Sequence, residues 1–277
     1  SQRQALYGEL THYLAERWQM TLGGRIERYR NDYLDTNQVD VQPRDTMVGG
    51  RMSLSYFPTI GQLVYVTWSR GYKTGGVNAE ALGKAKDHPE LEDYLLQRAS
   101  FTPEYLTSVE MGYKYVNDDD TLALNIALFT QTRDDVQLKS WVNRAQTFIG
   151  YIENAAAGTT RGIEADIQWQ VTPSLEWFTH IGLLDSEIQG FVTEDGIDME
   201  GREQAHAPKY QTNTGLNWQV SDTVLVNLQL DSKDGFYFSD SHNARSDHYN
   251  LLHASIRWQL DDWRITLWAR NLTDKDY

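Results

Sequence analysis

The stretch that decides the fold is residues 162–171, GIEADIQWQV, in which apolar and polar side chains alternate without interruption. One set of alternate positions is apolar: Ile163, Ala165, Ile167, Trp169 and Val171. The positions between them are acidic or carry an amide: Glu164, Asp166, Gln168 and Gln170. Because successive side chains of a β-strand point to opposite faces, this period of two predicts a strand with one apolar face and one polar face.

The same alternation returns in residues 18–27, 107–115 and 224–231. Their apolar positions are Trp18, Met20, Leu22, Ile26, Val109, Met111, Tyr113, Tyr115, Val224, Val226, Leu228 and Leu230. Their polar positions are Gln19, Thr21, Arg25, Glu27, Ser108, Glu110, Lys114, Asn227, Gln229 and Asp231. Residues 6–14 and 62–69 also resemble strands, but their pattern does not decide which face is apolar.

The connections between these strands alternate in length. We expect about twelve strands, several of them as long as the nine to eleven residues that a tilted strand needs to cross a bilayer. Short turns are predicted at 15–17, 58–59, 117–120, 172–173, 220–222 and 261–262. Long polar loops are predicted at 31–44, 74–103, 134–150, 190–207 and 239–247. Short turns at one end and long loops at the other are typical of an outer-membrane β-barrel.

Composition agrees with this class of protein. The net charge of −14 argues against nucleic acid as a partner, because phosphate binding needs clustered positive charge. The chain has no cysteine, so disulfides and thiolate metal sites are excluded. The mean hydropathy of −0.58 does not exclude a membrane, because a transmembrane strand presents only one face to lipid. We therefore expect Ile163, Ile167 and the apolar faces above to contact lipid, with Val226 near the bilayer midplane.

Aromatic residues gather beside the short turns. They are Trp18, Tyr56, Tyr115, Trp169, Trp177, Trp218, Trp258 and Trp263. Such rings form girdles at the membrane interface of barrels, although aromatic residues could also fill the core of a soluble sandwich. Their clustering at one end of the strands favours the girdle.

Several segments resemble the TonB-dependent outer-membrane receptors. The segments are 65–76 (YVTWSRGYKTGG), 101–114 (FTPEYLTSVEMGYK), 154–164 (NAAAGTTRGIE), 205–208 (AHAP) and 270–277 (RNLTDKDY). In this family 154–164 would open a strand. Glu164, Glu110 and Lys114 lie on the polar faces of their strands, so we expect them to point into the lumen. There they would either help to seat an inner domain or only stabilise neighbouring strands.

The resemblance implies that residues 1–277 are a partial barrel domain. The family has an amino-terminal plug and a closing strand, and neither has a counterpart here. No signal peptide opens the chain, which begins with the polar SQRQ. If the barrel has roughly 22 strands, the chain supplies about the tenth to the twenty-first. The expected fold class is therefore all-β, an antiparallel transmembrane barrel wall that is open or incompletely closed.

The resemblance also implies a function. Such receptors import scarce nutrients, most often ferric siderophores, and draw energy from the TonB complex through the plug. We expect a transporter in the outer membrane, surrounded by lipid, that needs no cofactor and is not an enzyme. A passive porin-like barrel and a soluble all-β binding domain are the alternatives. Cobalamin, saccharides, other chelates and heme remain open as substrates, and a loop histidine such as His242, His206 or His88 could ligate heme.

No catalytic motif or metal-ligand spacing appears in the sequence. His253 is expected to face inward with Ser255 and Arg257, and the acidic stretch 194–203 is expected to be a solvated loop. Ligand contacts should come from aromatic and cationic residues of the long loops, which suit an anionic or catecholate-like chelate. The candidates are Tyr94, Arg98, Trp141, Arg144, Phe236, Tyr237, His242 and Arg245.

Overall fold

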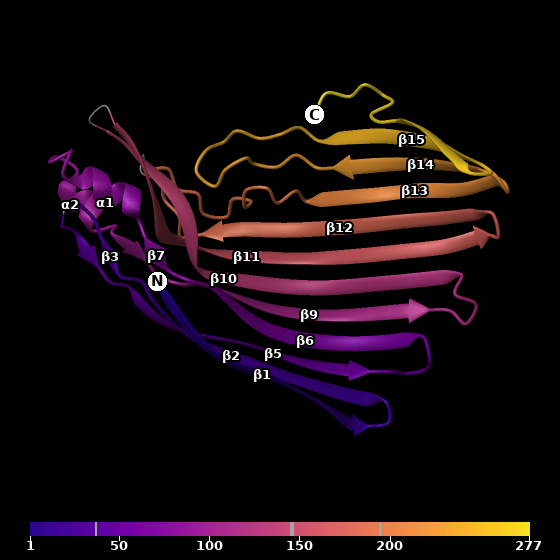
Figure 1. Cartoon of the computed structure of the whole chain (residues 1–277), viewed down its shortest axis with the longest axis horizontal. Coiled ribbons are helices and arrows are strands. Elements are labelled where there is room, and N and C mark those ends of the chain that lie inside the picture. Colours follow the sequence, from indigo (N-terminus) through magenta and orange to yellow (C-terminus); the bar gives the residue numbers. More distant parts are fainter. Residues whose placement is uncertain (37, 145–146, 194–195) are drawn as a thin grey trace.

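The computed structural model describes residues 1–36, 38–144, 147–193 and 196–277, without the side chains of Asn143, Arg144 and Thr147. Within this part of the chain, 12 antiparallel strands form one sheet and follow each other in sequence order. Figure 1 shows the sheet as a curved trough, with the short turns at one end and the long connections at the other. The predicted fold class and the number of strands are confirmed.

The strands of the sheet are long. They are β1 (Gln2–Ala15), β2 (Trp18–Arg30), β5 (Arg44–Tyr56), β6 (Gln62–Lys73), β9 (Glu104–Val116), β10 (Leu122–Arg144), β11 (Thr147–Thr172), β12 (Leu175–Gln189), β13 (Tyr210–Ser221), β14 (Val224–Lys233), β15 (Tyr249–Leu260) and β16 (Trp263–Ala269). Strands β1 and β16 are the two edges, and no ladder joins them within the described residues. The predicted open barrel wall is therefore observed.

Small elements occupy the long connections. They are β3 (Tyr33–Leu34), β4 (Asp40–Val41), β7 (Gly76–Val77), α1 (Ala79–Ala85), α2 (Glu92–Leu96) and β8 (Ser100–Phe101). The connections predicted as plain loops at 31–44 and 74–103 thus contain a small hairpin and two short helices. No helix among the described residues is both long and apolar enough to span a membrane.

The two faces of the sheet sort as the alternation predicts. Polar side chains of one face bond across neighbouring strands, as in the 2.6 Å contact between His180 Nδ1 and Asp166 Oδ1. Tyr65 likewise donates to Glu110 Oε1 at 2.7 Å. The opposite face is apolar and open, and Ile163 and Leu128, which lie opposite each other, are 41% and 43% exposed. Exposed apolar surfaces of this kind mark contact with a membrane or with another protein.

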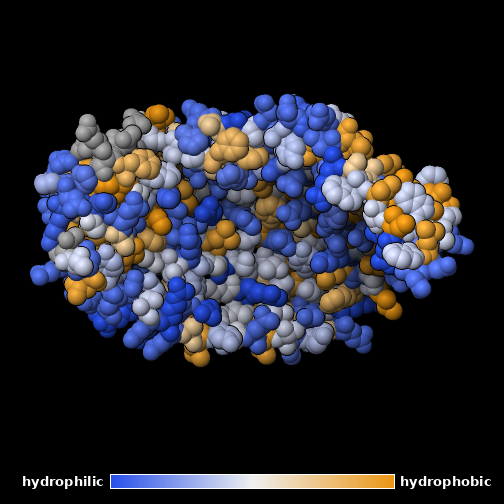
Figure 2. All heavy atoms as spheres, turned by 45° about the horizontal axis from the view of Figure 1, so that its top comes forward, coloured by the Kyte–Doolittle hydropathy of each residue, from blue (hydrophilic) through white to orange (hydrophobic). Residues whose placement is uncertain are grey.

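The polar face lines the hollow of the trough. Figure 2 looks onto this hollow, in which hydrophilic residues predominate. One group joins three strands, because Gln229 and His253 both bond to Asp231 at 3.1 Å and Asn213 donates to the same carboxylate. His253 therefore faces inward, as predicted, and such bonds hold neighbouring strands together.

The aromatic residues beside the short turns lie on the apolar face. Trp18 stacks on Tyr56 with ring centroids 4.6 Å apart, and Trp169 lies opposite Trp177 in the β11–β12 ladder. The girdle interpretation is supported by this shared face and shared end. Val226 lies directly opposite Trp218, so its assignment to the midplane is wrong. Val226 lies close to the short-turn end of β14, because the tight turn before this strand ends at Val224. Leu228 lies nearer the middle of the strand.

A second prediction is also wrong. Within the predicted loop 134–150, the described residues 134–144 and 147–150 belong to strands, because β10 and β11 stay paired beyond the ends of both neighbouring strands. We call residues 136–144 and 147–156 the arm, which projects from the long-loop end in Figure 1. A bulge between Arg133 and Val136, with Asp135 at φ 55°, bends the hairpin, and pairing then resumes. Segment 154–164 consequently lies inside β11 and does not open a strand.

Three glycines of the polar face make room for an aromatic ring of the adjacent strand. Tyr65, Phe129 and Phe178 cover Gly112, Gly162 and Gly215, where an added Cβ would collide with the ring. At Gly162 the Cβ would also lie 2.8 Å from the Leu183 carbonyl oxygen, which cannot move away without breaking the ladder. Such pairing of an aromatic ring with a glycine fixes strand register in curved sheets.

Replacing Gly162 with alanine should therefore lower the free energy of unfolding by about 1–3 kcal/mol through overpacking. Urea unfolding of the natural full-length protein in lipid vesicles measures this change. Gly24→Ala is the matched control, because a Cβ there meets nothing within 4 Å. Equal stability of the two variants would contradict the role assigned to Phe129.

Candidate ligand-binding surface

The base of the arm is held by a buried carboxylate. Glu104 Oε1 accepts hydrogen bonds from Arg133 Nε and Nη2 at 2.9 and 2.6 Å. Its second oxygen accepts the backbone N–H of Gln137 at 3.0 Å, directly after the bulge. Glu104 therefore satisfies the amide that the bulge removes from the ladder, and it fixes the direction in which the arm leaves the sheet.

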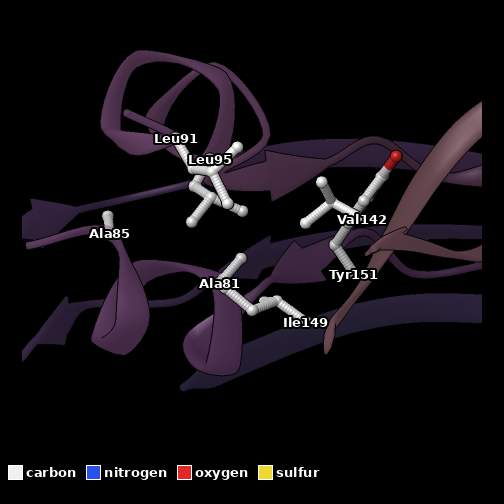
Figure 3. Close-up of a cluster of buried hydrophobic side chains, with 7 residues drawn as sticks. All are labelled: Ala81, Ala85, Leu91, Leu95, Val142, Ile149 and Tyr151. Carbon is white, nitrogen blue, oxygen red and sulfur yellow. The ribbon is translucent and has the colours of Figure 1, made fainter. Parts of the chain in front are cut away.

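An apolar cluster joins the arm to the two short helices. It consists of Ala81, Ala85, Leu91, Leu95, Val142, Ile149 and Tyr151. Figure 3 shows side chains from α1, from the start and end of α2 and from the arm directed toward one another. Leu95 and Val142 have no exposed surface. This packing explains why the 74–103 connection folds into helices instead of remaining a loop.

Asn78 completes the exposed edge of β11. The ladder between β11 and β12 ends at Ala157, so the backbone of Ile152 has no strand partner on that side. The Asn78 side chain donates to the Ile152 carbonyl at 2.7 Å and accepts from the Ile152 N–H at 2.8 Å. It also donates to the carbonyl of Arg98 at 2.8 Å. One amide group thus fixes the helical segment to the arm.

A second apolar cluster lies at the base of the arm and includes Phe191 and Met199 of the connection between β12 and β13. Its buried members are Val136, Leu138, Ile188, Phe191 and Met199. Gln204 of the same connection donates to the carbonyls of Thr159 and Glu187, both at 3.2 Å. The 74–103 connection and the connection between β12 and β13 therefore both pack against the arm.

Two of the predicted ligand contacts, Tyr94 and Arg98, meet beside the arm. The Arg98 guanidinium carbon lies 3.7 Å from the centroid of the Tyr94 ring, and its Nε lies 3.7 Å from Glu153 Oε2. The hydroxyl groups of Tyr94 and Tyr151 are 2.6 Å apart. Burial, the hydrogen bond with Tyr94 and the nearby Glu153 raise the pKa of Tyr151, so this phenol stays protonated. We call Tyr94, Arg98, Tyr151 and Glu153 the arm cluster.

Trp141 lies on the other face of the arm. Its ring stacks on Phe148 with centroids 5.9 Å apart, and Lys139 Nζ lies 5.3 Å from the Trp141 ring. Phe148 is 64% exposed, so this face remains open to a partner or solvent. The side chain of Arg144, another predicted contact, lies outside the described residues.

Tyr237 and Arg245 form a separate cluster on the 234–248 connection. The guanidinium carbons of Arg202 and Arg245 lie 4.0 and 5.1 Å from the centroid of the Tyr237 ring. Glu203 pairs with Arg245 at 3.4 Å and with Lys209 at 2.8 Å. The hydrogen bond from Lys209 to Glu203 raises the pKa of the lysine, which keeps it charged. We call Arg202, Glu203, Lys209, Tyr237 and Arg245 the ring cluster.

The last two predicted contacts adjoin the ring cluster. Phe236 lies against Phe238 and His206, with ring centroids 5.5 and 5.4 Å apart, and Lys233 Nζ is 4.4 Å from the Phe236 ring. His242 is exposed, and its Nδ1 accepts the Ala244 N–H at 3.3 Å. No group of three or more His, Asp or Glu side chains suited to a metal occurs within the described parts of the chain.

The structure therefore places the predicted residues that it describes at three positions at the long-loop end. Tyr94 and Arg98 belong to the arm cluster, and Trp141 lies on the other face of the arm. Tyr237 and Arg245 belong to the ring cluster, which Phe236 and His242 adjoin. Sequence reasoning missed Arg202, Lys209 and Tyr151. The alternation Val136, Leu138, Val142 could have revealed the arm, but no signal in the sequence places Arg202 beside Tyr237. In the ring cluster, cations outnumber the single carboxylate of Glu203, so the surface suits an anionic ligand with aromatic groups.

Comparison with known proteins agrees with this architecture. The family model "TonB dependent receptor-like, beta-barrel" matches residues 1–272. The Bordetella pertussis protein named "Probable TonB-dependent receptor BfrD" is 21% identical over 276 residues, which are 96% of this chain and 34% of that protein. The chain thus spans about a third of the curated relative's length.

Solved structures share the fold over almost the whole chain. The ferric yersiniabactin uptake receptor FyuA from Yersinia pestis superposes with a TM-score of 0.75 and 23% identity, covering 99% of this chain and 40% of the receptor. The copper transporter OprC gives a TM-score of 0.76 and 15% identity, covering 99% of this chain and 42% of the transporter. At these identities the likeness establishes the fold and leaves the ligand open.

Proposed function

The chain belongs to the TonB-dependent receptor family, and from that premise we propose that it forms part of the barrel wall of an outer-membrane receptor importing a scarce nutrient. The family consists of transport receptors, and its β-barrels are outer-membrane proteins. In this proposal the apolar face contacts lipid and the polar face surrounds the transport path. Energy reaches the receptor through TonB, which acts on a plug domain inside the barrel.

A ferric siderophore is the substrate class that we propose. The observation that carries this choice is the ring cluster, in which Arg202 and Arg245 lie against the Tyr237 ring beside Lys209. Guanidinium groups bind the oxygens of an anionic chelate, and aromatic rings stack on catecholate groups. FyuA takes up a ferric chelate, whereas OprC transports copper, so the substrate must be tested directly.

Uptake by a deletion strain tests the proposal. The natural full-length protein, expressed in that strain, should restore growth on one ferric chelate from a panel of catecholate, hydroxamate and carboxylate types. Dissipating the proton gradient should abolish this uptake, because TonB draws its energy from that gradient. Uptake that persists without the gradient would favour a passive barrel instead. Growth that is restored by copper alone would identify a metal ion, and not a ferric siderophore, as the substrate.

Charge removal in the ring cluster should weaken chelate binding. Arg245→Gln combined with Lys209→Gln removes two exposed cations, and we expect at least about a tenfold higher Kd for the anionic ferric chelate. Fluorescence quenching of the purified full-length protein measures the Kd. The matched control is Arg17→Gln with Arg264→Gln, which removes two cations at the short-turn end.

Failure of this prediction would be visible in two ways. Equal losses in the two double variants would indicate a general charge effect and no site at the long-loop end. Unchanged affinity after alanine replaces all eight predicted contacts would contradict the assignment altogether. Those contacts are Tyr94, Arg98, Trp141, Arg144, Phe236, Tyr237, His242 and Arg245.

A further inference from the structure

The outer face of β1, β2 and β5 changes character along the strands. Beside the short turn, Trp18 stacks on Tyr56. Farther along, apolar side chains lie opposite each other in two rows: Leu10, Leu22 and Met52, then Leu6, Ile26 and Val48. A row of three glycines, Gly8, Gly24 and Gly50, lies between them. The next rows on the same face are polar: Gln4, Arg28 and Thr46, then Gln2, Arg30 and Arg44. The apolar surface therefore ends at a row that contains arginine.

The apolar rows give way to polar rows at the level where a membrane boundary is expected. Residues 18–26 extend about 26 Å along the strand at about 3.3 Å per residue. A strand tilted by about 40° covers about 20 Å of membrane over that length, close to the apolar band of outer-membrane barrels. Because the long loops of such barrels are extracellular, Arg28, Arg30 and Arg44 lie where the headgroups of the outer leaflet begin.

We call Arg28, Arg30 and Arg44 the patch. Their positive charges are incompletely compensated by anionic groups. Arg30 lies directly opposite Arg44 in the β2–β5 ladder, an arrangement that is destabilising unless an anion is near. Arg30 pairs with Asp32 at 2.9 Å, but both side chains are about half exposed. Arg44 donates only to the neutral Gln42, at 3.2 Å. The guanidinium of Arg28, which lies opposite Gln4 and Thr46, has no hydrogen bond or ion pair within the described residues.

The patch also has a shape that a small anion can enter. A pocket of about 250 Å³ is lined by Arg28, Arg30 and Arg44, with Gln2 and Gln4 on its β1 side. Thr46, Tyr29 and Asp45 complete the lining, and Tyr29 and Asp45 lie opposite each other at the alternate positions of β2 and β5, which belong to the other face of the sheet. Leu6, Ile26 and Val48 continue from it toward the short turns and are 75%, 45% and 56% exposed. A headgroup in the pocket would thus have an apolar surface directly below it for its acyl chains.

We propose that Arg28, Arg30 and Arg44 bind the phosphate group of a phosphorylated lipid in the outer leaflet. Guanidinium groups donate paired hydrogen bonds to phosphate oxygens, and the anion removes the repulsion between Arg30 and Arg44. The continuous apolar surface below the arginines favours a lipid over free phosphate. The inference rests on the proposed outer-membrane location, and it concerns a surface that the imported ligand does not use.

Native mass spectrometry of the natural full-length protein from nanodiscs tests this proposal. The nanodiscs contain phosphatidylcholine with phosphatidic acid, whose phosphate monoester is the probe. The wild-type protein should retain phosphatidic acid in preference to phosphatidylcholine. The triple variant Arg28→Gln, Arg30→Gln, Arg44→Gln should lose this preference by at least about tenfold, since each cation near an anionic surface contributes measurably to binding.

Matched variants and competitors distinguish the outcomes. Arg3→Gln with Arg51→Gln removes cations from the polar face of the same strands and should leave lipid retention unchanged. Equal retention by the triple variant would overturn the proposal, as would complete displacement of phosphatidic acid by inorganic phosphate at the same concentration. Fractionation separately tests the outer-membrane location: a chain absent from that fraction refutes the proposed function, whereas loss of lipid preference alone does not.

Discussion

Replacing Glu104 with alanine is expected to weaken the attachment of the arm to the rest of the sheet. The free energy needed to detach the arm should fall by about 3 kcal/mol. Glu104 is buried, and its carboxylate accepts three hydrogen bonds, two from Arg133 and one from the backbone of Gln137. Removing one partner of a buried ion pair costs about 3–5 kcal/mol. The lower end of that range applies because a third of the Arg133 side chain reaches water.

Hydrogen exchange measures this release. In the natural full-length protein, the amides of residues 136–144 and 147–156 should exchange about a hundredfold faster in the variant, while the central parts of the strands stay protected. Glu104→Gln should have a smaller effect, because the amide keeps an acceptor for Gln137. Glu9→Ala is the control, since Glu9 makes only a 3.7 Å pair with Arg51 in which both side chains are 54% exposed. Unchanged protection of the arm would show that the two apolar clusters hold it without Glu104.

Introducing arginine at Leu228 should destabilise the protein in the membrane by about 2–4 kcal/mol, the cost of a cation at the lipid-facing midplane of a barrel. Leu228 is 44% exposed on the apolar face and lies opposite Leu216. Val226→Arg should cost less, about 0–1 kcal/mol, because its position beside Trp218 places it near the interface. Urea unfolding in lipid vesicles measures both values.

The neighbouring position provides the control. Gln229 follows Leu228 in the same strand but faces the hollow, where it donates to Asp231 at 3.1 Å. Gln229→Arg should leave stability within about 1 kcal/mol of the wild type, because the cation remains hydrated and can pair with that carboxylate. Comparable losses at Leu228 and Gln229 would contradict the assignment of one face to lipid and the other to the lumen.

Strand faces were predictable wherever the alternation was uninterrupted. Residues 162–171 assign Ile163 to lipid and Glu164 to the hollow, and the ladders confirm this separation. Residues 6–14 gave no answer, because Leu6, Gly8 and Leu10 alternate with Tyr7 and Glu9, which are amphipathic or charged. Only pairing with β2 shows that Leu6 and Leu10 lie beside Ile26 and Leu22.

The candidate site was less predictable than the fold. The sequence placed aromatic and cationic residues at the long-loop end but could not group them. Arg202 and Arg245 are 43 positions apart by their numbers, and they meet at Tyr237 because their two connections fold together. Residues 134–150 looked like a loop because their charges interrupt the pattern at Arg133 to Asp135, where the chain forms a bulge.

The residue pattern was enough to predict the family, the antiparallel sheet and the apolar and polar faces of its regular strands. These features can be predicted because the period of two and the length of each connection are properties of residues that are close together in the sequence. The arm, the two apolar clusters that pack against it and the grouping of Arg28, Arg30 and Arg44 became visible only in the tertiary structure. Their geometry depends on strand register and on contacts between distant connections, which a linear pattern does not contain.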